Sequence, residues 1–85
     1  MTERALDLEA VRAFIRIVEL GSFTRAAEAL QTTQAAVSLR LKRLEDRLGF
    51  RLVERTPRSV ELSAQGATFL EQARELMQAH DRAVS

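Results

Sequence analysis

The sequence predicts a small, mainly α-helical domain in which three helices precede a two-stranded ribbon and a long final helix. Two patterns indicate this fold. Apolar residues recur three or four positions apart through most of the chain, as on the buried face of a helix. Two short extended runs around Pro57 interrupt that spacing. With 85 residues, the chain is long enough for one modest core.

The first helix is expected over residues 7–20, because its apolar residues lie in helical register. These residues are Leu8, Val11, Phe14, Ile15 and Val18. Gly21 follows directly, and glycine is the residue that most often ends a helix. We expect this helix to pack against the two helices that follow it.

Residues 23–48 are expected to form two helices joined by a short turn at 31–33. Ser22 is the expected N-cap of the first of these helices and Thr33 that of the second. The buried positions are Phe23, Ala26, Ala27 and Leu30 in the first helix and Val37, Leu41, Leu44 and Leu48 in the second. Small side chains at 26 and 27 let two helices cross at close range. This pattern predicts a helix-turn-helix, whose second helix can read DNA.

The outward face of that second helix suits a DNA major groove. At about 100° per residue, this face comprises Ala35, Ser38, Leu39, Lys42, Arg43 and Asp46. Any amphipathic helix has a mixed outer face, but Ala35 and Leu39 gain nothing from water and can contact a thymine methyl group. Gln34 and Ser38 add hydrogen-bonding groups at the same end. We therefore predict base contacts from these four residues.

Positive charge is concentrated in the same part of the chain. Residues 34–58 contain seven basic and three acidic residues, a net charge of +4, whereas residues 1–33 carry −1 and residues 59–85 carry −2. A solvated surface would explain the number of charges but not their localisation. The predicted phosphate or groove contacts are Thr24, Thr33, Lys42, Arg43, Arg55 and Arg58.

The extended runs 52–55 and 59–62 flank Thr56, Pro57 and Arg58 and predict a hairpin. A hairpin directly after a helix-turn-helix is a wing, although a plain surface hairpin would show the same pattern. Arg58 at the tip and Arg55 at the base could enter a minor groove or hold a phosphate. Residues 1–62 are therefore predicted to form a winged helix-turn-helix.

A long linker helix is expected over residues 63–85, with Ser63 as its N-cap. Its apolar residues alternate at spacings of four and three, as in a coiled coil. This seam can fold back on the domain or face a second copy, and we favour dimerisation because three shorter helices already supply a core. The predicted dimer contacts are Phe69, Leu70, Ala73, Leu76, Met77 and His80. His80 could also sense pH, but packing or simple exposure is the more economical interpretation.

The composition argues against several other classes of function. The chain has no cysteine and one histidine, so it offers neither a thiolate metal site nor a histidine cluster. Its three glycines are too scattered for a phosphate-binding loop, which together with the lack of a nucleophile and base argues against an enzyme. There is no long apolar run for a transmembrane helix and no secretion signal at the start. We expect a cytoplasmic protein, with no cofactor in this chain.

Several short motifs occur together between residues 8 and 70. They are Phe14, the run from Gly21 to Ala27, Leu30, Thr33-Gln34, Ala36-Val37-Ser38, Leu44-Glu45, Leu48-Gly49, Leu52, Arg55 and Gly66. In this spacing they resemble the N-terminal domain of LysR-type transcriptional regulators. The resemblance implies a winged helix-turn-helix, a linker helix that pairs with that of a partner, and binding to interrupted inverted repeats, often A/T-rich, near promoters.

The resemblance also implies roles for individual positions. Those matching Gln34, Ala35, Ser38 and Leu39 approach bases, and those matching Arg55 and Arg58 lie near the minor groove or backbone. Such regulators continue into a two-lobed domain that binds a small-molecule effector, and some assemble as tetramers. The chain ends at or before that point, so we expect the effector-binding domain to be absent from it.

This sequence departs from the family at four positions. Ala35 stands where proline is common, Val53 where phenylalanine is common, and Ser63 where threonine is usual. Leu39 stands where related proteins often carry arginine or another polar residue. Base preference therefore cannot be transferred from any one relative.

Two other functions remain open from the residues alone. A winged-helix module that binds another protein would also use exposed Ala35 and Leu39, although the centres of protein interfaces are depleted of charge. A purely oligomeric role would use the linker helix but leave the outward face of residues 34–48 unexplained. The leading hypothesis is a sequence-specific transcription regulator that binds double-stranded DNA as a dimer.

Overall fold

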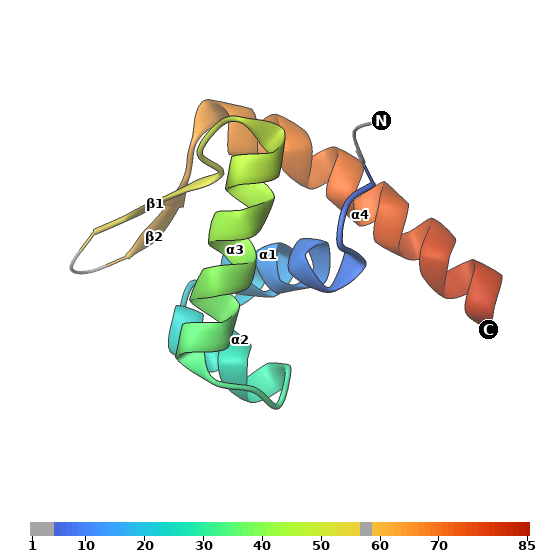
Figure 1. Ribbon diagram of the computed structural model, residues 1–85, viewed down its shortest axis with the longest axis horizontal. Helices are drawn as coiled ribbons and strands as arrows, with labels where there is room; N and C mark the ends of the chain where they lie inside the picture. Colours follow the sequence, from blue (N-terminus) through green and yellow to red (C-terminus); the bar gives the residue numbers. More distant parts are fainter. Residues whose placement is uncertain (1–4, 57–58) are drawn as a thin grey trace.

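The computed structural model describes residues 5–56 and 59–85, and within them the chain forms four helices and a two-stranded antiparallel sheet (Figure 1). The elements in chain order are α1 (Leu8–Leu20), α2 (Phe23–Ala29), α3 (Gln34–Leu48), β1 (Val53–Arg55), β2 (Val60–Leu62) and α4 (Ala64–Val84). The predicted winged helix-turn-helix with a long final helix is confirmed.

Each helix begins and ends within one residue of its predicted bounds, and the predicted caps are confirmed. The side chains of Ser22, Thr33 and Ser63 each accept a hydrogen bond from the backbone N–H three residues later, at 2.8–3.1 Å. Gly21 and Gly49 follow α1 and α3 with φ of 65° and 86°, a conformation that costs glycine little. These caps fix the lengths of the helices on which the site is built.

α1 lies at the centre of the core and contacts the other three helices. Val11, Phe14 and Ile17 on α1 are fully buried. Ala26 and Ala27 are also buried where α2 packs against α1 and α3, as their small size predicted. Figure 1 shows α3 standing across α1, with the hairpin leaving its upper end in one direction and α4 in the other. α3 therefore keeps one side free of the core.

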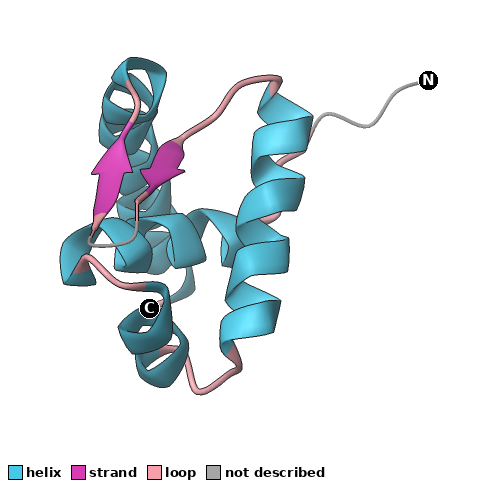
Figure 2. Cartoon of the chain, turned by 90° about the vertical axis from the view of Figure 1, so that its left-hand side faces the viewer, coloured by secondary structure: helices cyan, strands magenta, loops and turns pink. Residues whose placement is uncertain are grey.

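The end of α3, the start of β1 and the start of α4 meet around Leu52. Figure 2 shows the short loop that joins α3 to the hairpin beside it. Leu52 is fully buried, and its carbonyl oxygen accepts a hydrogen bond from Ser63 N at 2.9 Å. A Cβ atom added to Gly66, in the first turn of α4, would lie 2.0 Å from that carbonyl oxygen. Packing therefore requires glycine at 66, although glycine weakens a helix.

α4 packs along α1 with part of the apolar stripe that the sequence predicted as a dimer seam. Leu70, Ala73 and Met77 are buried in the core of this chain, and the Phe69 ring lies 5.8 Å from the Phe14 ring. These three buried residues are covered by their own domain, because α1 leaves a face open for α4. They are not accessible to a second copy.

The remaining positions of the predicted seam stay accessible. Phe69 and His80 are half-buried, and Leu76 is 38% exposed. Near its end α4 is tied to α1 by an ion pair between Arg12 Nη2 and Asp81 Oδ1 at 3.2 Å. Among the described residues, none of the helices is both long and apolar enough to cross a membrane.

Candidate nucleic-acid interface

α3 has one side in the core and one side in solvent. Its buried side consists of residues that the sequence predicted, Val37, Leu41 and Leu44. On the other side Gln34 and Ala35 are exposed, Ser38 is half-buried and Leu39 is 48% exposed. The structure therefore brings the four predicted base-contacting residues together at the N-terminal end of α3.

Thr24 on α2 lies beside the start of α3. Its hydroxyl group donates a hydrogen bond to Gln34 Oε1 at 3.2 Å. Thr33 Oγ1 is used as the N-cap of α3 and accepts from Ala36 N at 3.0 Å. The N-terminal end of a helix attracts anions because its first N–H groups and its dipole point outward. Thr24 and Thr33, which the sequence predicted as phosphate contacts, thus lie at the end of α3 where binding of a phosphate group is favourable.

Arg55, at the end of β1, reaches back to α3. Its Nη2 donates a hydrogen bond to Ser38 Oγ, and its Cζ lies 3.6 Å from the centroid of the Phe23 ring. A cation over an aromatic face is attracted by the ring quadrupole. The sequence predicted Arg55 and Ser38 as separate DNA contacts, whereas the structure joins them to each other.

An open groove of about 690 Å³ separates α3 from the hairpin. It is lined by Ser38, a predicted base contact, and by Lys42 and Arg55, which were predicted to contact phosphate or a groove. Arg51 also lines it. Its base is apolar, with Phe23 and Val53. α3 and the hairpin thus line the same groove.

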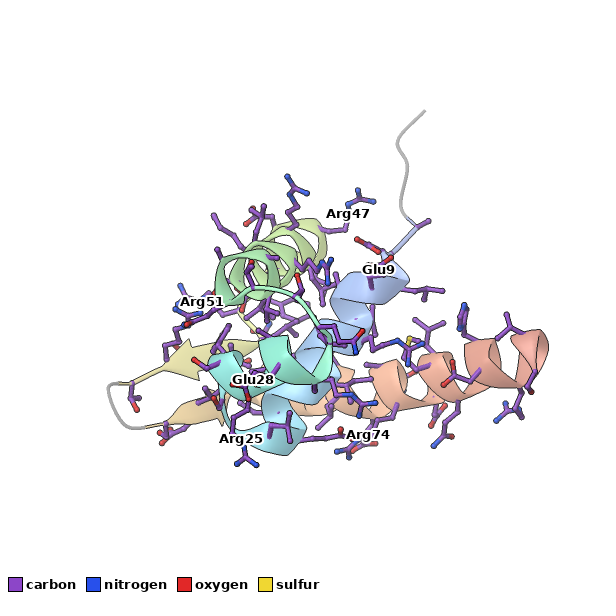
Figure 3. All side chains as sticks on the ribbon, turned by 90° about the horizontal axis from the view of Figure 1, so that it is seen from below. Glu9, Arg25, Glu28, Arg47, Arg51 and Arg74 are labelled. Carbon is purple, nitrogen blue, oxygen red and sulfur yellow. The ribbon has the colours of Figure 1, made fainter. Side chains whose placement is uncertain are left out.

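Basic side chains on the side of α3 nearest the chain start are used within the molecule. Arg40 Nη2 lies 3.6 Å from the Glu9 carboxylate, and Arg47 Nη1 donates to the Ala5 carbonyl oxygen at 2.9 Å. Figure 3 shows Arg47 on this side, towards Glu9, and Arg51 on the side of the wing. Two basic residues of the positively charged segment, Arg40 and Arg47, therefore bind Glu9 and Ala5 and attach this part of the chain to α3.

Other basic side chains near α3 remain available. Lys42 Nζ lies 3.6 Å from Asp46 Oδ2, and both side chains are about two-thirds exposed, at 71% and 67%. Such a pair contributes little and rearranges readily. Arg43 and Arg51 are exposed and form no ion pair with residues 5–56 or 59–85. Arg51 was counted in the positive charge of residues 34–58 but was not predicted as an individual DNA contact, because it lies in the loop between two periodic segments.

Glu45 is another residue whose role the sequence did not reveal. Its Oε2 accepts hydrogen bonds from the backbone N–H groups of Leu52 and Val53, at 2.7 and 3.3 Å. These bonds tie the start of the wing to the last turns of α3 and fix the position of one relative to the other. The Leu44-Glu45 pair can be recognised in the sequence, but helical periodicity does not reveal that Glu45 accepts hydrogen bonds from the start of the wing.

Arg58, predicted at the tip of the wing, lies outside the described residues. At the base of the tip, Thr56 N donates to Ser59 O at 3.0 Å, and Ser59 N donates to Thr56 Oγ1 at 2.9 Å. These bonds close the predicted hairpin. Within residues 5–56 and 59–85, there is no group of three or more His, Cys, Asp or Glu side chains that could hold a metal ion.

Comparisons with known proteins agree with this geometry. The model of the lysR family of bacterial regulatory helix-turn-helix proteins matches residues 8–67. The HTH-type transcriptional activator AllS of Klebsiella pneumoniae is 51% identical over 70 residues, which cover 82% of this chain and 26% of AllS. The chain therefore spans about a quarter of the length of such relatives.

Two solved structures that contain DNA share the fold. The CbnR DNA-binding domain in its DNA complex matches with a TM-score of 0.87 and 34% identity, over 91% of this chain and 88% of that one. The BenM DNA-binding domain with benA site 1 DNA matches with a TM-score of 0.86 and 36% identity, over 92% and 88%. The fold, the family model and these similarities show that the chain belongs to the lysR family of bacterial regulatory helix-turn-helix proteins.

Proposed function

We propose that this chain is the sequence-specific DNA-binding part of a transcription regulator. The exposed side of α3 enters the major groove of double-stranded DNA, and the wing lies against the adjacent backbone or minor groove. The observation that carries the proposal is the cluster at one end of α3 of exposed Gln34, Ala35 and Leu39 with half-buried Ser38. The DNA-bound domains of CbnR and BenM, which share this fold, support it.

The chemistry of this cluster suits base edges. A glutamine amide can pair with adenine through two hydrogen bonds, and a serine hydroxyl can donate or accept. Ala35 and Leu39 suit thymine methyl groups, which supports an A/T-containing site. Leu39 is 48% exposed, so contact with DNA would remove apolar surface from water.

Phosphate contacts would set the register of α3 in the groove. Arg43 and Arg51 are exposed without an ion pair in the described residues, and Lys42 can leave Asp46 at little cost. Thr24 and Thr33 stand at the N-terminal end of α3. Arg58 would contribute from the wing. Each phosphate neutralised releases about one counterion, so binding should weaken as salt increases.

The chain would bind DNA as a dimer that forms through α4, and a longer protein would assemble as a tetramer. Leu76 is exposed, and an apolar groove beside α4 is lined by Phe50, Thr68 and Phe69. Two copies related by a two-fold axis would present two copies of α3 to an interrupted inverted repeat. Leu76→Gln should then yield monomers with much weaker operator binding, measured by sedimentation and by titration with DNA.

The full protein would extend beyond this chain. Relatives such as AllS are about four times as long as the matched segment. We expect residues 1–62 to be the winged domain, residues 63–85 to be the linker, and a following domain to bind a small-molecule effector in a cytoplasmic regulator.

Selection of this chain's preferred duplexes from a random pool tests the proposal. Sequencing the selected duplexes and measuring their binding at several salt concentrations separates base recognition from phosphate contact. Enrichment of an interrupted two-fold repeat is the expected result. Salt-sensitive binding without enrichment would contradict base recognition by α3.

Exposure of Leu39 also suits the alternative of a protein-binding winged helix. Such a module would bury Ala35 and Leu39 against a partner protein and would show no salt-dependent affinity for duplex DNA. Absence of DNA binding in the selection would favour this alternative. The net charge of +4 over residues 34–58 argues against it, because the centres of protein interfaces are depleted of charge.

A further inference from the structure

The bond between Arg55 and Ser38 places a positive charge beside a base-contacting residue. Arg55 Nη2 donates to Ser38 Oγ, and the guanidinium lies 3.6 Å from the centroid of the Phe23 ring. Phe23 is 6% exposed and therefore held firmly in the core. Arg55 forms no ion pair with residues 5–56 or 59–85, so no described carboxylate neutralises it.

The bond also biases the Ser38 hydroxyl towards donating a hydrogen bond. A guanidinium carries only donors, so Ser38 Oγ is the acceptor in this contact. The hydroxyl hydrogen remains, and Ser38 donates to no group within the described residues. In particular, it makes no bond to the carbonyl oxygen four residues earlier, as Thr68 does on α4. Ser38 therefore has a donor to offer in the groove that it lines.

We propose that Arg55 makes Ser38 selective for keto bases over cytosine, an inference that rests on the proposed function. In the major groove, guanine O6, thymine O4 and the N7 atoms of both purines are acceptors, whereas cytosine presents only the donor hydrogens of N4. A free serine hydroxyl can serve either kind of base, because it both donates and accepts. Arg55 occupies one of the two acceptor lone pairs of Ser38 Oγ and leaves the hydroxyl hydrogen available for donation to a keto oxygen. The guanidinium charge also repels the partly positive hydrogens of an amino group.

Arg55 is thus a positioning residue that acts through Ser38, and Phe23 holds it in place. A phosphate contact by Arg55 would strengthen binding to every duplex equally. The proposed role instead changes the preference at one base pair. This difference separates the inference from the role in groove or phosphate contact that the sequence predicted.

The test uses the preferred duplex selected with the unaltered chain. Ser38→Ala first identifies the base pair that Ser38 reads, as the position where the preference is lost. Duplexes with G or T at that position are then compared with duplexes carrying C, using the unaltered chain, Arg55→Gln and Arg51→Gln. Arg51→Gln is the matched control, because Arg51 is an exposed arginine beside the same groove with no bond to Ser38.

The unaltered chain is expected to favour the keto bases by about tenfold, the value of one hydrogen bond. Arg55→Gln should reduce that preference to about twofold at this base pair and leave the other positions unchanged. Arg51→Gln should weaken all duplexes alike and keep the preference. Phe23→Leu, which removes the ring under the guanidinium, should change the preference in the same direction as Arg55→Gln.

Three outcomes would overturn the inference while the proposed function stands. They are an unchanged keto preference in Arg55→Gln, an equal loss on all duplexes in that variant, and a Ser38→Ala variant whose base preferences are intact. Absence of any sequence preference in the unaltered chain would overturn the proposed function together with this inference. Because Arg55 is exposed, its replacement leaves the core intact, which circular dichroism at the assay temperature checks.

Discussion

The two sides of α3 are built for different purposes. The inner side buries Val37, Leu41 and Leu44, which are at most 5% exposed, and extends through Glu45 to the start of the wing. On the outer side Leu39 is 48% exposed, and the Lys42 side chain is 71% exposed. Both sides belong to a single helix, so residues adjacent in the sequence can lie on opposite sides, as Leu41 and Lys42 do.

This contrast shows that folding and base recognition are separable on one helix. Substitutions on the inner side, or at the junction that it supports, should change the free energy of unfolding. Substitutions on the outer side should change DNA affinity and leave stability almost unchanged. The variants below test this separation, in order of decreasing expected effect.

Gly66→Ala should be the most damaging single change at the junction behind α3. The added Cβ would lie 2.0 Å from the Leu52 carbonyl oxygen, which is backbone and cannot move without displacing β1. We expect a loss of about 3 kcal/mol or more in the free energy of unfolding, measured by urea denaturation. Gln65→Ala, at an exposed neighbouring position, is the control and should change stability by under about 0.5 kcal/mol.

Alanine is also the better helix former, by about 1 kcal/mol over glycine. If Gly66→Ala stabilised the chain, helix propensity would outweigh the close approach of α4 to Leu52. The packing of Gly66 on the Leu52 carbonyl oxygen would then be looser than the structure shows, and Leu52 would not connect the buried side of α3 to α4.

Glu45 and Asp46 are adjacent acidic residues on opposite sides of α3 and make a matched pair. Glu45→Ala leaves the N–H groups of Leu52 and Val53 without their acceptor, which should cost about 1–3 kcal/mol of stability. Asp46→Ala removes only an exposed ion pair with Lys42, worth under about 0.5 kcal/mol. Urea denaturation of both variants measures the difference. Equal losses would contradict the contrast between the two sides.

Much of α3 could be predicted from the sequence, because its buried residues and caps follow local rules. Spacing identified Val37, Leu41 and Leu44, and the Thr33 cap and the Gly49 end were recognisable residue types. The backbone of Gln31, with φ of 57°, could not be predicted, because nothing local requires a left-handed residue there.

Contacts between elements also could not be predicted from the spacing of apolar residues. Glu45 bonds to Leu52, seven residues later, and Arg55 bonds to Ser38, seventeen residues earlier. Each depends on how the wing packs against α3. The stripe on α4 was visible, but periodicity does not distinguish burial against α1 from burial against a second copy.

Gln34→Ala tests the outer side of α3. We expect it to cost about 1–3 kcal/mol of binding free energy on the preferred duplex and to leave stability unchanged, because Gln34 is exposed. Thr24→Val, which removes the donor to Gln34 Oε1 but keeps the amide, should cost less. Fluorescence anisotropy with preferred and unrelated duplexes measures both effects. An equal loss on all duplexes would show that Gln34 does not read bases.

The smallest effect is expected at the end of α4, which belongs to neither side of α3. Asp81 accepts hydrogen bonds from His80 at 3.3 Å and from Arg12 at 3.2 Å, and these bonds lower the pKa of its carboxyl group. A carboxylate whose pKa is lower in the folded chain stabilises the fold above its unfolded pKa of about 4. That contribution is lost as the pH falls through the lower, folded pKa.

Asp81→Asn should therefore reduce stability slightly at pH 7 and make stability fall less steeply below about pH 4. Urea denaturation at a series of pH values measures the slope. Glu75→Gln is the control, because Glu75 is an exposed carboxylate on α4 without an ion pair in the described residues. If both variants showed the acid dependence of the unaltered chain, the Arg12–Asp81 contact would not hold α4 to α1. The packing of Met77 and its buried neighbours would then account for the attachment of this helix by itself.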